Sequence, residues 1–241
     1  MQTRPRLAVP SLLSLLTALL AAALLVAGCS SSSSSKQSEK PLPDAANLVQ
    51  QSAQATKSLK SVHLKLTVQG QIKDLPIETL EGDLTTSPNV AAQGKANLLF
   101  LGQKFEGVNF VVADGTLYAA ITANSWQNFG PAADIYDVAA ILNPDTGLAN
   151  VLANFSNPKA EARETVNGVD TVRVTGQVSA DAVNKIAPQI AATGPVPATA
   201  WIQEDGDHQL VQAKLEPTPG NSVTMTLSDW NKPVTVTKPA V

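Results

Sequence analysis

Residues 62–69 are Val62-His63-Leu64-Lys65-Leu66-Thr67-Val68-Gln69, and every even position is aliphatic whereas every odd position is polar. In a β-strand, successive side chains point to opposite faces of the sheet. The alternation therefore predicts a strand with one face in a core and the other in water. Similar segments follow, and we expect further strands near residues 76–86, 92–101, 105–113, 116–122, 222–228 and 233–238.

Short turn motifs separate these strands. Asp114-Gly115 and Asn167-Gly168 are each flanked by apolar residues, and such dipeptides favour the two-residue turns of β-hairpins. Glu204-Asp205-Gly206-Asp207 predicts another hairpin, and Pro219-Gly220-Asn221 leads into a further strand. Because a parallel neighbour would need a crossover of a dozen or more residues, we expect antiparallel pairing.

Two helices are expected at the ends of the strand groups. Asp44 can cap a helix whose apolar residues recur at steps of three and four and which ends near Lys60-Ser61. Another helix should open after Ser179 and stop before Pro188.

The middle of the chain predicts two more helices, over residues 132–155, separated by Asn143-Pro144-Asp145. Pro144 disfavours helix at Asn143, and Asp145 and Thr146 can cap the second helix. With helices gathered on one side of one curved antiparallel sheet, the fold class is α+β.

The N-terminus has the pattern of a bacterial lipoprotein signal. Arg4 and Arg6 precede an apolar stretch that ends in Leu25-Val26-Ala27-Gly28-Cys29. Cys29 is the only cysteine of the chain, so a disulfide within the chain is excluded. We expect residues 1–28 to be a cleaved signal peptide and Cys29 to carry the lipid anchor. The alternative is an uncleaved transmembrane anchor.

Composition separates a tether from a domain. The serine run Ser30 to Ser35 continues into a polar segment, so residues 29–43 are expected to form a flexible tether after the lipidated Cys29. Residues 44–241 contain every expected helix and strand, and no second linker interrupts them. We therefore expect one domain over 44–241.

The chemistry of the chain argues against an enzyme. It contains no Gly-x-Ser-x-Gly elbow, no His-Glu-x-x-His motif, no phosphate-binding glycine loop and no dinucleotide fingerprint. His63 and His208 are both expected in solvent, and we assign no catalytic residue, no metal ligand and no cofactor. The net charge is −3, and −5 without residues 1–28, which disfavours nucleic acid as a partner.

Inward-facing positions are rich in small apolar side chains. Hydrophobic residues make up 44% of the chain but aromatic residues only 4%, so Ala, Val, Leu and Ile must fill the interior. Two alternatives follow, a densely packed aliphatic core or a cavity for acyl chains. The candidate cavity residues, assigned by strand parity and helical pattern, are Leu64, Leu66, Val68, Ala96, Leu98, Phe100, Val108, Phe110, Val112, Leu117, Ala119, Ile121, Ile135, Val138, Leu142, Leu148, Val151 and Leu152.

Several long blocks resemble a known family. The first blocks are the lipoprotein signal that ends in Cys29 and the serine tether. They are followed by Leu80-Glu81-Gly82-Asp83-Leu84-Thr85-Thr86, residues 129–137, and Leu142-Asn143-Pro144-Asp145-Thr146-Gly147-Leu148. Pro195-Val196-Pro197-Ala198-Thr199 and Trp201-Ile202-Gln203-Glu204 continue the likeness. The chain resembles the LppX/LprA/LprF/LprG family of mycobacterial lipoproteins from its signal to its C-terminus.

The resemblance implies a half-barrel sheet with helices on its concave side around an apolar cavity. It implies binding of triacylated glycolipids, namely phosphatidylinositol mannosides, lipomannan and lipoarabinomannan, and of triacylglycerol. It further implies transport from the inner membrane toward the outer mycomembrane, with a major-facilitator transporter as partner and the innate receptor TLR2 as a host partner. The protein would be lipid-anchored on the periplasmic face of the inner membrane, with cell-wall or secreted forms as alternatives.

Two rival functions remain open at this stage. One is a structural or signalling lipoprotein with a filled core. The other is an envelope hydrolase whose site carries no familiar motif.

Overall fold

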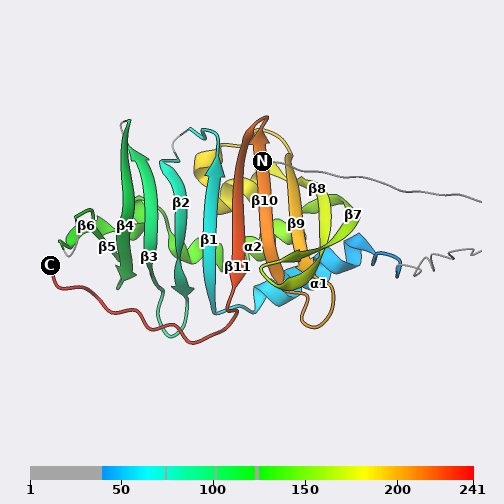
Figure 1. Cartoon of the computed structure of the whole chain (residues 1–241), viewed down its shortest axis with the longest axis horizontal. Coiled ribbons are helices and arrows are strands. Elements are labelled where there is room, and N and C mark those ends of the chain that lie inside the picture. The colour runs from blue at the N-terminus through cyan, green and yellow to red at the C-terminus, as the bar shows by residue number, and fades with distance from the viewer. Residues whose placement is uncertain (1–39, 74, 101, 123–124) are drawn as a thin grey trace, which may run out of the picture. The chain divides into compact units, whose positions relative to one another are not determined.

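Eleven strands form one sheet in the computed structural model, which describes residues 40–73, 75–100, 102–122 and 125–241 (Figure 1). The strand order across the sheet is β6-β5-β4-β3-β2-β1-β11-β10-β9-β8-β7, and every neighbouring pair is antiparallel. The strands are β1 (Ser61–Gln69), β2 (Ile77–Thr85), β3 (Ala91–Phe100), β4 (Gln103–Ala113), β5 (Thr116–Ala120), β6 (Gln127–Pro131), β7 (Phe155–Val166), β8 (Val169–Val178), β9 (Val196–Gln203), β10 (Leu210–Thr218) and β11 (Asn221–Ser228).

The sheet grows from its centre to one edge and then returns from the other edge. Strands β1 to β6 follow one another outward, and β7 to β11 then run inward until β11 pairs with β1. Leu64 of β1 lies opposite Gly82 of β2 and Leu227 of β11, so the alternating segment is the central strand. The predicted strand at 62–69 is confirmed, and so is the α+β class with helices on the concave side.

The predicted hairpin turns have the backbone that their sequences require. Asp114 and Gly115 take φ values of 50° and 72°, and Asn167 and Gly168 take 49° and 79°. Positive φ at both central residues is the mark of the turn that matches the twist of a hairpin.

Helices begin after Asp44 and after Ser179 as predicted, and each of the two residues caps its helix with its side chain. Helix α1 spans Ala45–Lys57, and the Asp44 carboxylate accepts a hydrogen bond from the Asn47 backbone N–H at 2.8 Å. Helix α3 spans Ala180–Ile186, and the Ser179 hydroxyl oxygen accepts from the Ala182 N–H at 3.3 Å. The sequence of α1 also places Leu48, Val49 and Ser52 on its buried face.

The prediction of a regular helix before Asn143 is wrong. That segment contains two short 3₁₀ helices, η1 (Ala132–Asp134) and η2 (Val138–Ile141). The chain is extended between them at Asp137, whose carboxylate accepts from the Ala139 N–H at 3.0 Å and so starts η2 separately. Asp side chains compete with the helical backbone in this way.

The second predicted helix exists, although its cap differs. Helix α2 spans Leu148–Ala153, and Gly147 stands at the N-cap. The side chain of Asn143 accepts from the N–H groups of Asp145 and Thr146 at 2.9 and 3.2 Å. Asn143 therefore organises the turn before α2, and neither of the predicted caps, Asp145 and Thr146, stands at the N-cap.

The predicted strand at 233–238 is also wrong. We call residues 229–238 the C-terminal strap, because they cross the sheet from β11 toward β5 (Figure 1). Pro233 provides no N–H for a ladder, and both sides of β1 are already occupied by β2 and β11. Val234 and Val236 are instead half-buried, because their side chains both point toward the sheet that the strap crosses.

The apolar core lies between the concave face of the sheet and the helices. Its most buried side chains include Val172, Val174, Val183 and Ile202, all inaccessible to solvent. Pro41–Val241 forms one compact unit, and Leu42 packs against its core. Among the described residues, none of the helices is long and apolar enough to cross a membrane.

Candidate functional site

An apolar cavity of about 160 Å³ lies between the sheet and its helical cover. Its lining comes from both halves of the sheet and from η2, α2, α3 and the 3₁₀ helix η3 (Pro188–Ile190). The lining residues are Leu64, Leu66, Leu75, Ile77, Leu80, Gly82, Asp83, Leu84, Ala92, Phe110, Tyr136, Val138, Ile141, Leu148, Val151, Ile186, Ala187, Gln189, Ile190, Ala213, Leu215, Val223 and Met225. Such a surface can bind hydrocarbon through the burial of apolar area.

Two facing glycines shape the cavity floor. Gly82 of β2 lies directly opposite Gly94 of β3, between Leu64 on one side and Phe110 on the other. A Cβ atom on Gly94 would lie 2.2 Å from the Glu81 carbonyl oxygen and 2.8 Å from the Gly82 Cα. The two strands therefore approach so closely at this point that only glycine fits, and glycines at such positions commonly mark a tight bend of a sheet.

A buried tyrosine joins two parts of the cavity roof. The Tyr136 hydroxyl donates a hydrogen bond to the Ile186 carbonyl at the end of α3, at 2.8 Å. Burial raises the pKa of Tyr136 well above its ordinary value, and the neighbouring Asp137 charge adds to the effect. The hydroxyl consequently keeps its proton, and remains a donor, through the neutral range.

We expect Tyr136→Phe to loosen the roof without unfolding the domain. The ring would still line the cavity, while the loss of one hydrogen bond should lower the free energy of unfolding by about 1 kcal/mol. Because burial raises the pKa of Tyr136, the free energy of unfolding keeps this contribution in full below the ordinary value of 10.0 and falls as the pH rises above it, where the unfolded chain ionises while the buried hydroxyl keeps its proton. Urea titrations from pH 7 to 11 should therefore show an alkaline decline in wild type that is smaller in Tyr136→Phe.

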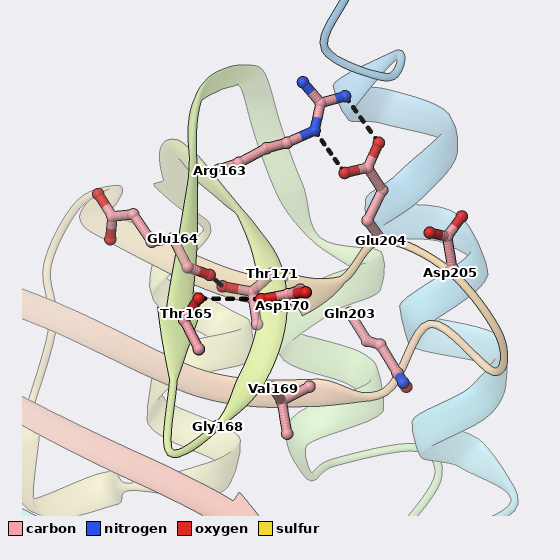
Figure 2. A pocket seen from close by; sticks show the side chains of 10 residues that line it. All are labelled: Arg163, Glu164, Thr165, Gly168, Val169, Asp170, Thr171, Gln203, Glu204 and Asp205. Atoms are coloured by element: carbon pink, nitrogen blue, oxygen red, sulfur yellow. Dashed lines mark hydrogen bonds and ion pairs between the residues drawn. The ribbon is translucent and has the colours of Figure 1, made fainter. Parts of the chain in front are cut away.

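A second pocket, of about 620 Å³, is polar and open, and it lies between the β7–β8 and β9–β10 hairpins (Figure 2). The Arg163 guanidinium forms a bidentate ion pair with Glu204, at 2.6 and 2.7 Å. Thr165 donates to Asp170 at 2.9 Å across the β7–β8 turn. The ion pair links the two hairpins to each other, and the Thr165 bond lies within the β7–β8 hairpin.

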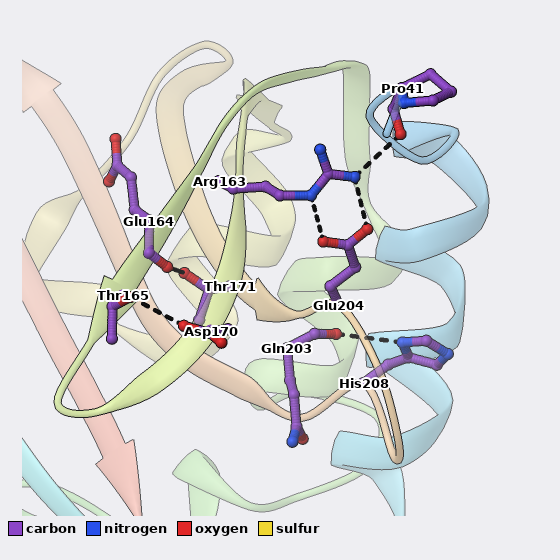
Figure 3. A network of polar contacts seen from close by, with 9 residues as sticks. All are labelled: Pro41, Arg163, Glu164, Thr165, Asp170, Thr171, Gln203, Glu204 and His208. Atoms are coloured by element: carbon purple, nitrogen blue, oxygen red, sulfur yellow. Dashed lines mark hydrogen bonds and ion pairs between the residues drawn. The ribbon is translucent and has the colours of Figure 1, made fainter. Parts of the chain in front are cut away.

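The same polar network holds the start of the domain (Figure 3). Arg163 also donates to the Pro41 carbonyl at 3.0 Å, and His208 lies 3.2 Å from the Gln203 carbonyl. The contact with Pro41 fixes the point at which the chain enters the domain. The network is thus structural in kind, and the described residues contain no cluster of three or more His, Cys, Asp or Glu side chains suited to a metal.

The sequence profile of the LppX_LprAFG lipoprotein family matches residues 44–236. The chain belongs to this family. The match begins at the cap of α1 and ends within the strap, so it covers the sheet and the whole cavity lining.

Several relatives in the family carry a common name. The lipoarabinomannan carrier protein LprG of Mycolicibacterium smegmatis is 64% identical over 241 residues, which is 100% of each chain. The protein of the same name from Mycobacterium tuberculosis is 59% identical over 206 residues, 86% of each chain.

Solved structures of family members share the fold. LprF from Mycobacterium bovis superimposes with a TM-score of 0.76 at 33% identity, covering 83% of this chain and 99% of that chain. LppX from Mycobacterium tuberculosis superimposes with a TM-score of 0.62 at 29% identity, covering 80% and 97%.

The sequence-derived candidates fall into distinct places in this family member. Leu64, Leu66, Phe110, Val138, Leu148 and Val151 line the cavity. Val112, Leu142 and Leu152 are buried in the adjoining core, and Leu117 packs against it. Ala96, Val108 and Ala119 are buried in the sheet, and Val68 and Leu98 are half-buried. The structure describes only the backbone of Phe100, and Cys29 lies outside the described residues.

Two of the candidates lie on the surface. Ile121 follows the last residue of β5 and is 48% exposed, and Ile135 follows η1 and is 57% exposed. Strand parity placed Ile121 inside, but the strand ends before it. The predicted regular helix would have turned Ile135 inward, but the short 3₁₀ helix η1 ends just before this residue.

Sequence reasoning missed the contribution of β2, β10 and β11 to the cavity. Ile77, Leu80, Ala213, Leu215, Val223 and Met225 all line it. Parity on β10 and β11 was a usable signal, since Ala213 lies opposite Met225 and Leu215 lies opposite Val223. The pairing of β11 with β1 brings the residues of β10 and β11 to the cavity floor, and the local sequence pattern does not reveal that pairing.

Proposed function

We propose that this domain is a carrier that shields the acyl chains of a glycolipid in the cavity beneath its helices. The observation that supports this most strongly is the almost wholly apolar lining, built from six strands and four short helical segments. The name of the relatives, lipoarabinomannan carrier protein, supports a glycolipid as cargo. Each buried CH₂ group of an acyl chain would contribute about 0.8 kcal/mol.

The cavity must widen to take such a cargo. Its volume of about 160 Å³ is below the ~300–1,000 Å³ usual for small-molecule sites. The roof consists of short pieces, η2, α2, α3 and η3, connected by irregular chain. Short segments can shift on a rigid sheet more readily than one long helix, so we place the expansion in the roof.

The finer proposals concern cargo, route and partners. The cargo comprises triacylated phosphatidylinositol mannosides, lipomannan, lipoarabinomannan and triacylglycerol, moved from the inner membrane toward the outer mycomembrane. A major-facilitator transporter is the proposed membrane partner, and TLR2 the proposed host receptor. The carrier acts without a catalytic step or cofactor, and its anchor is the acylated Cys29 on the periplasmic face.

Native mass spectrometry tests the carrier against its rivals. The domain Pro41–Val241, purified from a mycobacterial host, should retain masses of acylated glycolipid or triacylglycerol. A scaffold with a filled core would carry none, even after incubation with vesicles of phosphatidylinositol mannosides. Turnover of an ester or glycoside panel by lipid-free protein would instead favour the hydrolase.

The anchor has a separate test. Because the chain has one cysteine, Cys29→Ala should abolish incorporation of labelled palmitate and leave the domain's melting temperature unchanged. Cys29→Ser, which also lacks a thiol, should behave in the same way. Labelling of either variant at the wild-type level would contradict the assignment of the anchor.

A further inference from the structure

A row of five side chains marks the path of the strap on the face of the sheet that points away from the cavity. His63, Asp83, Gln93, Val111 and Tyr118 lie opposite one another in register on β1, β2, β3, β4 and β5. The strap is anchored near each end of this row, at Ser61 of β1 and against Val111 and Tyr118. It therefore spans the convex face of the strands whose concave face forms half of the cavity floor.

The first anchor of the strap is on β1. The Lys60 N–H donates to the Asn231 side-chain oxygen at 2.8 Å, and the Asn231 N–H donates to the Ser61 carbonyl at 2.9 Å. The Ser61 hydroxyl donates to the Lys232 carbonyl at 2.6 Å. Three hydrogen bonds thus fix the strap where β1 begins.

The second anchor is apolar and lies on β4 and β5. Val236 packs against Val111, Ala113 and Tyr118, which form a small core of their own outside the main one. The Lys238 ammonium lies 5.5 Å from the centre of the Tyr118 ring, within the range of a cation–π contact.

The strap has almost no slack between its anchors. Four residue steps separate Lys232 from Val236, and a fully extended chain covers about 14 Å in that length. Three strand spacings separate β1 from β4, also about 14 Å at the usual spacing of ~4.8 Å. Because the strap lies outside the mid-plane of a curved sheet, its path would lengthen if the curvature increased, and no spare chain exists to cover the increase.

The part of the sheet under the free span of the strap contains the facing glycines of β2 and β3. A polar gap of about 250 Å³ separates residues 233–235 of the strap from His63, Asp83 and Gln93. Gly82 and Gly94 lie next to Asp83 and Gln93 in the same two strands, without side chains on the concave face. This glycine pair therefore offers less steric resistance to further curling than a pair of larger residues would.

We propose that the strap is a tie that limits how tightly the β1–β5 half of the sheet can curl. It thereby keeps the cavity, when no lipid is bound, open to an incoming acyl chain. The inference rests on the proposed carrier function. An empty apolar cavity lacks the van der Waals contacts that its walls would gain by closing. The tie opposes that closure and leaves widening free, because widening shortens its path.

Lengthening the strap tests the tie without removing either anchor. We would insert Gly-Gly between Thr235 and Val236 in the domain Pro41–Val241, with the same insertion after Ala240, beyond both anchors, as the control. The variant with Gly-Gly between Thr235 and Val236, which we call the slack variant, should take up fluorescent triacylated phosphatidylinositol mannoside from vesicles several-fold more slowly than wild type and the control. Uptake of a single-chain fatty acid should change less, because it needs less of the cavity.

A lipid-independent measurement separates this inference from the proposed function. Crystal structures of both lipid-free variants should show a smaller cavity only in the slack variant. Equal cavities would overturn the tie, whatever the uptake rates. A smaller cavity with unchanged triacyl uptake would overturn its role in loading, whereas failure of the wild-type domain to bind any lipid would overturn the carrier function and leave the tie judged on the cavity alone.

Discussion

Ala213→Phe should abolish most glycolipid binding while the domain stays folded. Ala213 is half-buried, lines the cavity and lies opposite Met225 on the neighbouring strand. A phenyl ring at this position would occupy much of the 160 Å³ without adding a polar atom. Excluding only two CH₂ groups of cargo, at about 0.8 kcal/mol each, weakens binding about tenfold. Vesicle-to-protein transfer of a fluorescent triacyl lipid measures the loss.

Ala200→Phe is the matched control on the next strand. Ala200 lies opposite Ala213 in register but is only 2% exposed and belongs to the filled core. Overpacking there should cost about 1–3 kcal/mol and lower the melting temperature. If Ala213→Phe lost as much stability as Ala200→Phe and still bound lipid normally, the space beside Ala213 would not be the cargo site.

Local sequence determined the elements wherever a residue's role depends on its near neighbours. The alternation at 62–69 became the central strand because Val62 and Leu64 lie in the core and Leu66 lines the cavity. Asp44 and Ser179 became caps because a cap needs only a backbone N–H three residues ahead. Asp114-Gly115 became a hairpin turn for an equally local reason, its positive φ angles.

Tertiary pairing decided what local pattern could not. Whether Val234 and Val236 extend the sheet or cross it depends on which strand edges are free, and β1 has none. Ile135 has the spacing of a helix, yet the Asp137 carboxylate interrupts the helix within two residues. The cavity lining from β10 and β11 depends on the return of the chain to β1, which only the complete strand order specifies.

Gly94→Val should destabilise the domain more than an ordinary surface substitution by a wide margin. The new Cβ would lie 2.2 Å from the Glu81 carbonyl oxygen and 2.8 Å from the Gly82 Cα, and both are backbone atoms that cannot rotate away. Strands β2 and β3 would have to separate, which breaks ladder hydrogen bonds at the cavity floor. We expect a loss of about 3 kcal/mol or more in the free energy of unfolding, measured by urea denaturation.

Gly194→Val tests whether this loss comes from the close approach of the strands rather than from glycine replacement in general. No heavy atom lies within 4 Å of a Cβ built on Gly194, so valine there should change the free energy of unfolding by no more than about 0.5 kcal/mol. The reciprocal substitution Gly82→Val should resemble Gly94→Val, since its Cβ would lie 2.2 Å from the Gln93 carbonyl oxygen. Wild-type stability in both strand variants would mean that β2 and β3 do not approach this closely, and the bend beneath the strap would then lose its physical basis.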